Sequence, residues 1–349
     1  MNIDTRNSSI LKVILAGAGT FIIIYGMRLS ASILSPILLA LIIGISVLPV
    51  ANWLSRKGAP DWLALSVTLV LIILGIVGLI ALIGISVNDL ITVLPKYQDN
   101  TEGLINSLQT FLGGLGLGNS QIQSSLGQID ASKFLGPIGS FLGGILGSLS
   151  NLMIMLMVLI FFLLGTPMLS SKLKLDFPAN SPTLARFGGL IRDLREYVSI
   201  TTWINFLVGL VNTLFLIILG VDFAILWGLL SFLTGYIPNI GFWIALIPPF
   251  ILALLEFGAG KALIVLVGYV VINGGVQNFL QPKMMGAGLN LSTFVVMLSL
   301  FFWGWVLGPM GALLAVPLTM IVKEVFLDAY DETRPLAELM SADIPSNNN

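Results

Sequence analysis

The chain has 349 residues, of which 56% are hydrophobic and 9% are charged, with a formal net charge of −1 and a mean hydropathy of +1.00. Soluble domains typically carry about 25% charged residues, so this composition excludes a soluble protein and indicates a polytopic, all-α membrane protein. Cys and His are both absent, which excludes disulfides, thiol nucleophiles, His-ligated metals and a His general base. We therefore expect no metal and no cofactor, and without a basic tract we expect no nucleic acid partner.

The first part of the sequence, residues 1–87, contains three apolar runs that are candidate membrane spans, over 13–27, 33–53 and 61–87. A helix of about 20 apolar residues crosses a bilayer, so each run approaches or exceeds the necessary length. The loop before the third run carries Arg56 and Lys57. Short basic loops tend to stay in the cytoplasm, which places this loop inside.

The next segment, 88–133, is the least hydrophobic part of the chain, and we expect it to be extracytoplasmic. Apolar residues at helical spacing over 104–112 predict an amphipathic helix, which the glycine-rich run 113–118 ends. A long glycine-rich span is then predicted over 134–169. Its glycines Gly139, Gly143 and Gly147 share one helix face, where small residues let another helix of the same or a neighbouring protomer pack closely.

Residues 170–202 combine basic side chains with apolar residues at helical spacing, which is typical of an amphipathic helix at a membrane surface. Because basic residues gather here and at 56–57, we expect this connection and both termini to be cytoplasmic. Further spans are predicted over 203–219 and 261–280, and a polar C-terminal tail over 326–349.

A break interrupts the apolar run over 223–255. Pro238 lacks a backbone donor and disfavours a helical conformation in the residue before it. Asn239 can bond the freed backbone, and Gly241 can adopt positive φ. In hydrocarbon, such a break survives only where it is buried in protein or faces a polar cavity.

The run over 291–322 carries a matching break at Pro309 and Gly311. In both breaks a Gly follows the Pro, an Ala follows that Gly by one helical turn, and a second Pro lies beyond. Two interrupted segments in corresponding places are typical of the binding region of a transporter, so 203–325 is the predicted transport core.

Each broken segment is long enough for a tilted crossing or for a re-entrant hairpin, and the count of basic residues does not separate these alternatives. We favour hairpins, because 203–255 and 261–322 would then be oppositely oriented copies of one span plus one hairpin, an inverted repeat. The remaining alternative is a pair of ordinary spans with proline kinks, since Gly and Pro are common in membrane helices.

Uncharged amides form two stripes beside the breaks. Asn205 and Asn212 lie two turns apart, and Asn273, Gln277 and Gln281 follow one another by single turns. Facing inward, the stripes would supply paired donors and acceptors to a small, uncharged, polyhydroxylated solute. Equally, they could be structural hydrogen bonds between neighbouring helices.

Carboxylates inside spans are the usual mark of ion coupling, and few candidates exist here. Asp222 opens the first broken segment and Glu256 closes it. Both lie near predicted span ends, where a solvated interfacial carboxylate is the alternative to a coupling role.

Four stretches of the C-terminal region are distinctive: Y-I-P-N-I-G-F-W-I-A-L-I-P-P, V-Q-N-F-L-Q-P-K-M-M-G, L-N-L-S and F-F-W-G-W-V-L-G-P-M-G-A-L-L-A-V-P-L. They resemble the autoinducer-2 exporter family of bacterial and archaeal membrane proteins, over nearly the whole chain. The resemblance implies about eight membrane segments and homo-oligomers, as pentamers. It also implies either export of the furanone autoinducer-2 or exchange of sodium or lithium for protons, and it assigns no substrate residue.

From the residues and the resemblance together we expect a secondary transporter of the cell membrane that exports a small polar solute by alternating access. Its hinge and site backbone would be formed by Pro238, Asn239, Gly241, Pro309 and Gly311. The alternatives are a cation/proton antiporter that uses Asp222 or Glu256, and an oligomeric channel. Apart from the solute and membrane lipid, the expected partner is a second copy of the chain, and no catalytic constellation indicates an enzyme.

Overall fold

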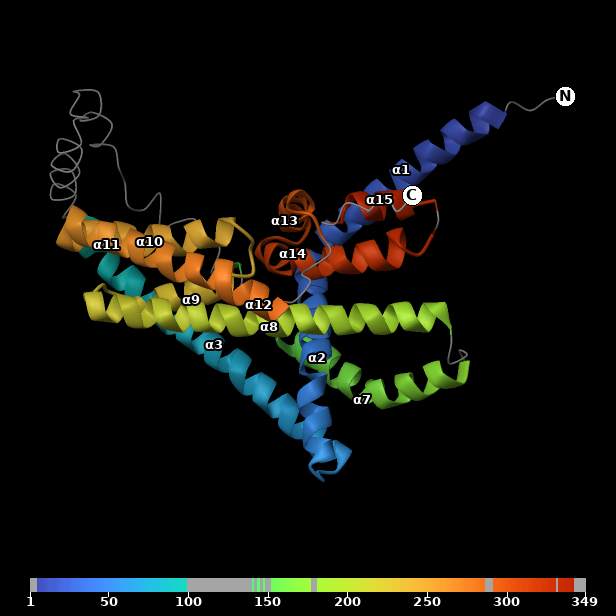
Figure 1. The fold of residues 1–349 in the computed structure, drawn as a ribbon, viewed down its shortest axis with the longest axis horizontal. Helices are drawn as coiled ribbons and strands as arrows, with labels where there is room; N and C mark the ends of the chain where they lie inside the picture. The colour runs from blue at the N-terminus through green and yellow to red at the C-terminus, as the bar shows by residue number, and fades with distance from the viewer. Residues whose placement is uncertain are drawn as a thin grey trace.

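The structure, a computed structural model, describes residues 5–98, 140, 143–144, 147, 152–176, 181–285, 291–330 and 332–341, and every regular element in these ranges is a helix (Figure 1). The helices are α1 (Thr5–Leu29), α2 (Ala31–Arg56), α3 (Asp61–Gln98), α7 (Leu152–Asp176), α8 (Pro182–Leu219), α9 (Ala224–Thr234), α10 (Ile240–Phe257), α11 (Ala259–Gly275), the π-helix η1 (Val276–Leu280), α12 (Gln281–Met285), α13 (Thr293–Leu307), α14 (Pro309–Val322), the π-helix η2 (Lys323–Leu327) and α15 (Arg334–Leu339). Among the described residues, α2, α3, α8, α10 and the stretch Pro309–Leu327 are each long and apolar enough to cross a membrane. The expected all-α polytopic membrane protein is confirmed.

The first two expected spans are not separated by a loop. Ser30 alone joins α1 to α2, and the two helices meet at an open angle (Figure 1). The third helix, α3, extends beyond the expected 61–87 to Gln98. The expected amphipathic helix over 104–112, the glycine run 113–118, Gly139 and the end of the tail from 342 lie outside the described residues.

Of the expected surface helix over 170–202, residues 170–176 belong to α7, whereas residues 182–202 share one helix with the expected span over 203–219. From Pro182 to Leu219, α8 runs for 38 residues without interruption, roughly 57 Å at 1.5 Å per residue. The boundary that we placed between the two segments therefore falls inside α8. The physical reason is that no proline follows the first residue of the helix, and the first terminator is Gly220, at φ 73°.

The first broken segment is a helical hairpin. Its first arm, α9, has 11 residues, about 17 Å and too short to cross hydrocarbon. After the break at 235–239, α10 returns antiparallel to α9. The Lys261 ammonium, just beyond α10, donates to the carbonyl oxygen of Leu219 at 3.0 Å. Both ends of the hairpin thus lie at the C-terminal end of α8.

The second broken segment is also a hairpin, formed by α13 and α14 around Gly308. The indole Nε1 of Trp303 donates to Thr319 Oγ1 at 3.1 Å and ties the two arms together. The open end of this hairpin packs near the N-terminal half of α8, where Leu291 and Val316 form a buried cluster with Tyr197. The two hairpins therefore enter from opposite ends, which agrees with the expected inverted arrangement.

In each hairpin a glycine allows the second arm to touch a carbonyl of the first. A Cβ added to Gly241 would collide with the carbonyl oxygen of Thr234, and one added to Gly311 would collide with that of Trp303. Our expectation that Gly241 takes positive φ was wrong. Positive φ occurs instead at Asn239 (φ 61°) in the first break and at Gly308 (φ 68°) in the second. The reason is that the turn lies at the last residue before the second arm, whereas Gly241 and Gly311 already lie within that arm.

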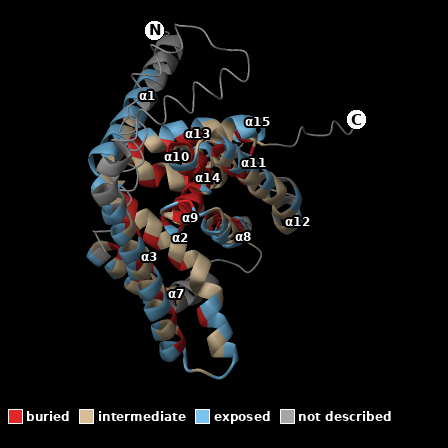
Figure 2. Cartoon of the chain, turned by 90° about the vertical axis from the view of Figure 1, so that its left-hand side faces the viewer, coloured by how far each residue is buried: buried red, intermediate tan, exposed pale blue. Residues whose placement is uncertain are grey.

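Close backbone contact also fixes the first hairpin on α8. A Cβ on Gly209 of α8 would lie 2.7 Å from the carbonyl oxygen of Gly228 in α9, and a Cβ on Gly228 would lie 2.7 Å from that of Gly209. Buried residues gather in α9, α10 and α14, whereas α1 and α3 are largely exposed (Figure 2). The described core thus lies around the hairpins.

Of the expected glycine face, the structure describes Gly143 and Gly147, and neither is in close contact with a described atom at its Cβ position. A Cβ on Gly143 or Gly147 would meet nothing within 4 Å, whereas one on Gly144 would lie 2.7 Å from Pro309 Cγ. The glycine that approaches another segment is therefore on a different face from the one we expected. Packing of Gly143 and Gly147 between protomers stays a prediction.

We predict that Gly308→Ala destabilises the protein. Alanine at φ 68° and ψ −153° should cost roughly 1–3 kcal/mol of backbone strain, visible as a lower Tm in detergent. The matched control is Gly260→Ala in α11, where a Cβ meets nothing within 4 Å and helix propensity should favour alanine. Equal Tm changes in the two variants would contradict the strain.

We also predict that single cysteines at Asp222 and Glu256 react with a membrane-impermeant maleimide from the same side, because both flank the open end of the first hairpin. A cysteine at Tyr330, beyond the open end of the second hairpin, should react from the other side. The chain has no native Cys, so no background has to be removed. Labelling of Asp222→Cys and Glu256→Cys from opposite sides would mean that this segment crosses the membrane.

Candidate functional site

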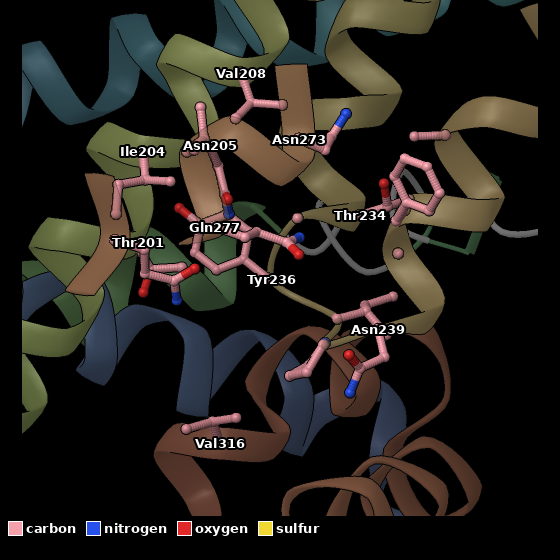
Figure 3. A pocket seen from close by; sticks show the side chains of 18 of the residues that line it. Thr201, Ile204, Asn205, Val208, Thr234, Tyr236, Asn239, Asn273, Gln277 and Val316 are labelled. Atoms are coloured by element: carbon pink, nitrogen blue, oxygen red, sulfur yellow. The ribbon is translucent and has the colours of Figure 1, made fainter. Parts of the chain in front are cut away.

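A cavity of about 320 Å³ lies where the break of the first hairpin meets the middle of α8, the junction of α11, η1 and α12, and the beginning of α13. Figure 3 shows side chains from these elements converging on it. Of the amides that we selected from the sequence, it brings together Asn205, Asn273, Gln277 and Gln281, and of the break residues Pro238, Asn239 and Gly241.

The α8 wall is built around Asn205. Its side chain is only 6% exposed, and its Nδ2 has no hydrogen-bond partner among the described residues. The carboxamide packs directly on Gly235 at the end of α9, where a Cβ would collide with Asn205 Oδ1. Asn205 and Gln277 both line the cavity (Figure 3). A buried, unpaired amide donor that faces a cavity is available to a ligand acceptor.

The opposite wall comes from the end of α11 and from η1. The Nδ2 group of Asn273 donates to the carbonyl oxygen of Tyr269 at 2.9 Å, which leaves the Asn273 side-chain oxygen as an acceptor. Gln277 lies within the π-helix Val276–Leu280 and is exposed in the cavity. π-Helical turns often mark functional sites, because they change the direction of side chains relative to an α-helix.

Tyr236 is a cavity residue that we did not select from the sequence. Its hydroxyl lies 2.6 Å from Thr202 Oγ1, and Thr202 donates to the carbonyl oxygen of Val198 at 2.6 Å. Since a threonine hydroxyl has one proton, Tyr236 must be the donor of this pair. Its oxygen can then only accept a hydrogen bond from a ligand. Its position just before a predicted helix break was the available signal.

Asn212 lies behind the cavity rather than on its wall. It is fully buried and donates from Nδ2 to Ser231 Oγ at 3.1 Å. Ser231 in turn donates to the carbonyl oxygen of Trp227 at 2.8 Å and lines the cavity. This side chain joins α8 to the first hairpin, as in the structural alternative that we left open for the amides.

The remaining candidate residues lie elsewhere. Pro309 lines a separate apolar groove at the tip of the second hairpin, and Gly311 is buried against Trp303. Asp222 and Glu256 lie at the open end of the first hairpin, where Glu256 interacts electrostatically with Asp222 and Lys261. No Asp, Glu, Lys or Arg is among the described residues that line the cavity, so this site offers neutral donors and acceptors.

We predict that Asn212→Ala and Asn205→Ala differ in stability. Asn212→Ala breaks a buried hydrogen bond and should lower the free energy of unfolding by about 1–3 kcal/mol, whereas Asn205→Ala removes an unpaired amide at an existing cavity and should change it little. Thermal unfolding in detergent measures both. The reverse order would place the structural role at Asn205.

Comparison with known proteins agrees with this architecture. Residues 14–331 match the protein family described as AI-2E family transporter. The chain is 36% identical over 331 residues to the AI-2 transport protein TqsA of Escherichia coli (strain K12). The aligned region covers 95% of this chain and 96% of that protein. It is 34% identical to a putative transport protein of Haemophilus influenzae over 96% of this chain and 97% of that one. With the putative transport protein YhhT of Escherichia coli (strain K12) it shares 32% identity over 90% of this chain and 89% of that one. With this coverage, the chain belongs to the AI-2E transporter family and is a multi-pass membrane transport protein rather than an enzyme.

Proposed function

We propose that this transporter exports a small, uncharged, polyhydroxylated solute of the autoinducer-2 type by alternating access. The proposal rests mainly on the cavity at the break of the first hairpin, whose described lining combines amide and hydroxyl groups with apolar side chains and carries no charged side chain. A charged substrate would leave its charge unpaired in such a site. A solute with several hydroxyl groups would instead pair with the amides.

The size and chemistry of the cavity support this class of solute. Its volume of about 320 Å³ is at the lower end of the roughly 300–1,000 Å³ that is usual for small-molecule sites. Asn205 Nδ2 supplies a donor, and Tyr236 and Asn273 supply acceptors. Hydroxyl groups both donate and accept, so one solute can satisfy both walls. The similarity to a protein named as an AI-2 transport protein supports autoinducer-2 as the first solute to test.

The hairpins suggest how access alternates. Their breaks end in the middle of the protein and their open ends lie at opposite ends of α8, so movement of one hairpin against the other would expose the cavity to alternate sides. We further propose that residues 203–325 are the transport core, that both termini are cytoplasmic, and that the protein works in the cell membrane as a homo-oligomer.

A cation/proton antiporter is supported less well. The carboxylates that we considered for coupling, Asp222 and Glu256, lie at the open end of the first hairpin rather than on the described cavity wall. At the mouth of a hairpin they can remain solvated and need not bind an ion in transit.

We predict that Asn205→Ala raises the solute concentration for half-maximal flux in proteoliposomes by roughly threefold to tenfold, the loss expected from one neutral hydrogen bond. Asp222→Asn is the control and should leave flux unchanged. Autoinducer-2 loaded into vesicles of both orientations gives the direction of transport.

Other results would reassign the function. Solute-independent proton movement that requires sodium and disappears in Asp222→Asn would identify an antiporter. Unitary currents in planar bilayers would identify a channel.

A further inference from the structure

A second, apolar space lies next to the cavity, and one residue of the break lines both spaces. A groove of about 460 Å³ runs between the beginning of α10 and the tip of the second hairpin, and Gly304, Gly308 and Ala312 form its hairpin side. Ile237 lines both the cavity and the groove. This isoleucine therefore forms part of the wall between a site for polar solutes and a second space.

Ile237 is held by apolar packing. It is 4% exposed and belongs to a buried cluster whose other members come largely from the second hairpin, among them Leu300, Trp303 and Leu307. A side chain from the tip of one hairpin is thus inserted into the core of the other. The contact between the two hairpins at this point is a hydrophobic seal.

The backbone around Ile237 allows this seal to open without unwinding a helix. Ile237 lies in the break, where its amide donates to the carbonyl oxygen of Thr234 at 2.8 Å and its carbonyl accepts from Gly241 at 3.0 Å. The neighbouring bond to the second hairpin is weak, from Asn239 Nδ2 to Met297 Sδ at 3.6 Å. Separation of the hairpin tips would break apolar contacts and little hydrogen bonding.

The two spaces follow one another along α13. The cavity faces the beginning of this helix at Thr293 and Val296, whereas the groove faces its end at Gly304 and Trp305. Eight residues separate Val296 from Gly304, about 12 Å along the helix. The groove therefore lies farther toward the tip of the second hairpin than the cavity does.

We propose that Ile237 is the gate residue of the transport path, an apolar constriction that closes the solute cavity on the side of the second hairpin. An apolar constriction of this kind stops water and polar solutes because it cannot replace their hydrogen bonds. The gate opens when the hairpin tips separate and closes when Ile237 packs against Leu300. This inference rests on the proposed transport function, but its test needs no solute.

The test uses a single cysteine, Gln277→Cys, on the cavity wall of the otherwise Cys-free chain. With Ile237 present, a membrane-impermeant maleimide should modify this cysteine from one side of the membrane only. Ile237→Ala should abolish this sidedness, so that reagent on either side modifies it. Ile237→Val, which keeps a branched apolar side chain, should stay one-sided.

Matched variants separate the gate from general loosening. Ile244→Ala shortens an isoleucine that lines the groove but not the cavity and should keep labelling one-sided. Leu300→Ala shortens the opposing side of the seal and should abolish sidedness, so it carries the test if Ile237→Ala does not elute as a folded protein. One-sided labelling in the folded Ile237→Ala or Leu300→Ala variant would overturn the gate, whereas an altered substrate in the transport assay would overturn only the proposed function.

Discussion

The architecture depends on the need to pair backbone groups where helices break inside a membrane. An unpaired amide or carbonyl in hydrocarbon costs several kcal/mol, so broken helices persist only within protein or beside a polar cavity. At the first break, amides bond to nearby carbonyls, as those of Gly235, Ile237 and Gly241 do to Ser231, Thr234 and Ile237. The first break borders the polar cavity, and Gly308 and Pro309 at the second break are half-buried. This requirement brings the two hairpin tips and α8 together.

Close contacts of backbone with backbone make this arrangement possible. Gly241 and Gly311 bring the second arm of each hairpin against a carbonyl of the first, and Gly209 and Gly228 bring α9 against α8. Lys261 adds a hydrogen bond to the carbonyl at the end of α8. The first hairpin and α8 are consequently joined by polar and backbone contacts, whereas at Ile237 the two hairpins are joined by apolar packing. The weaker contact therefore lies beside the cavity, where a transporter has to open.

The chemistry of the cavity follows from this geometry. A break exposes polar backbone and side chains at its tip, and the neighbouring helices face it with Asn205 and Gln277. Amides satisfy one another or a ligand without adding a charge that hydrocarbon would penalise. The neutral cavity therefore favours the small polar solute that we propose over an ion.

The sequence by itself determined the membrane class, the helical fold, both breaks and most of the amides on the cavity wall. These features depend on composition and on local chemistry, such as the missing donor of Pro238 or the helical spacing of Asn273, Gln277 and Gln281. Only the tertiary structure decided that the broken segments are hairpins, that α8 is continuous and that Asn212 lies behind the wall. It also placed Asp222 and Glu256 away from the cavity and brought Tyr236 and Ile237 to it. The physical reason is that these outcomes depend on which segments, distant in sequence, pack together, and helical periodicity identifies a face without identifying what covers it.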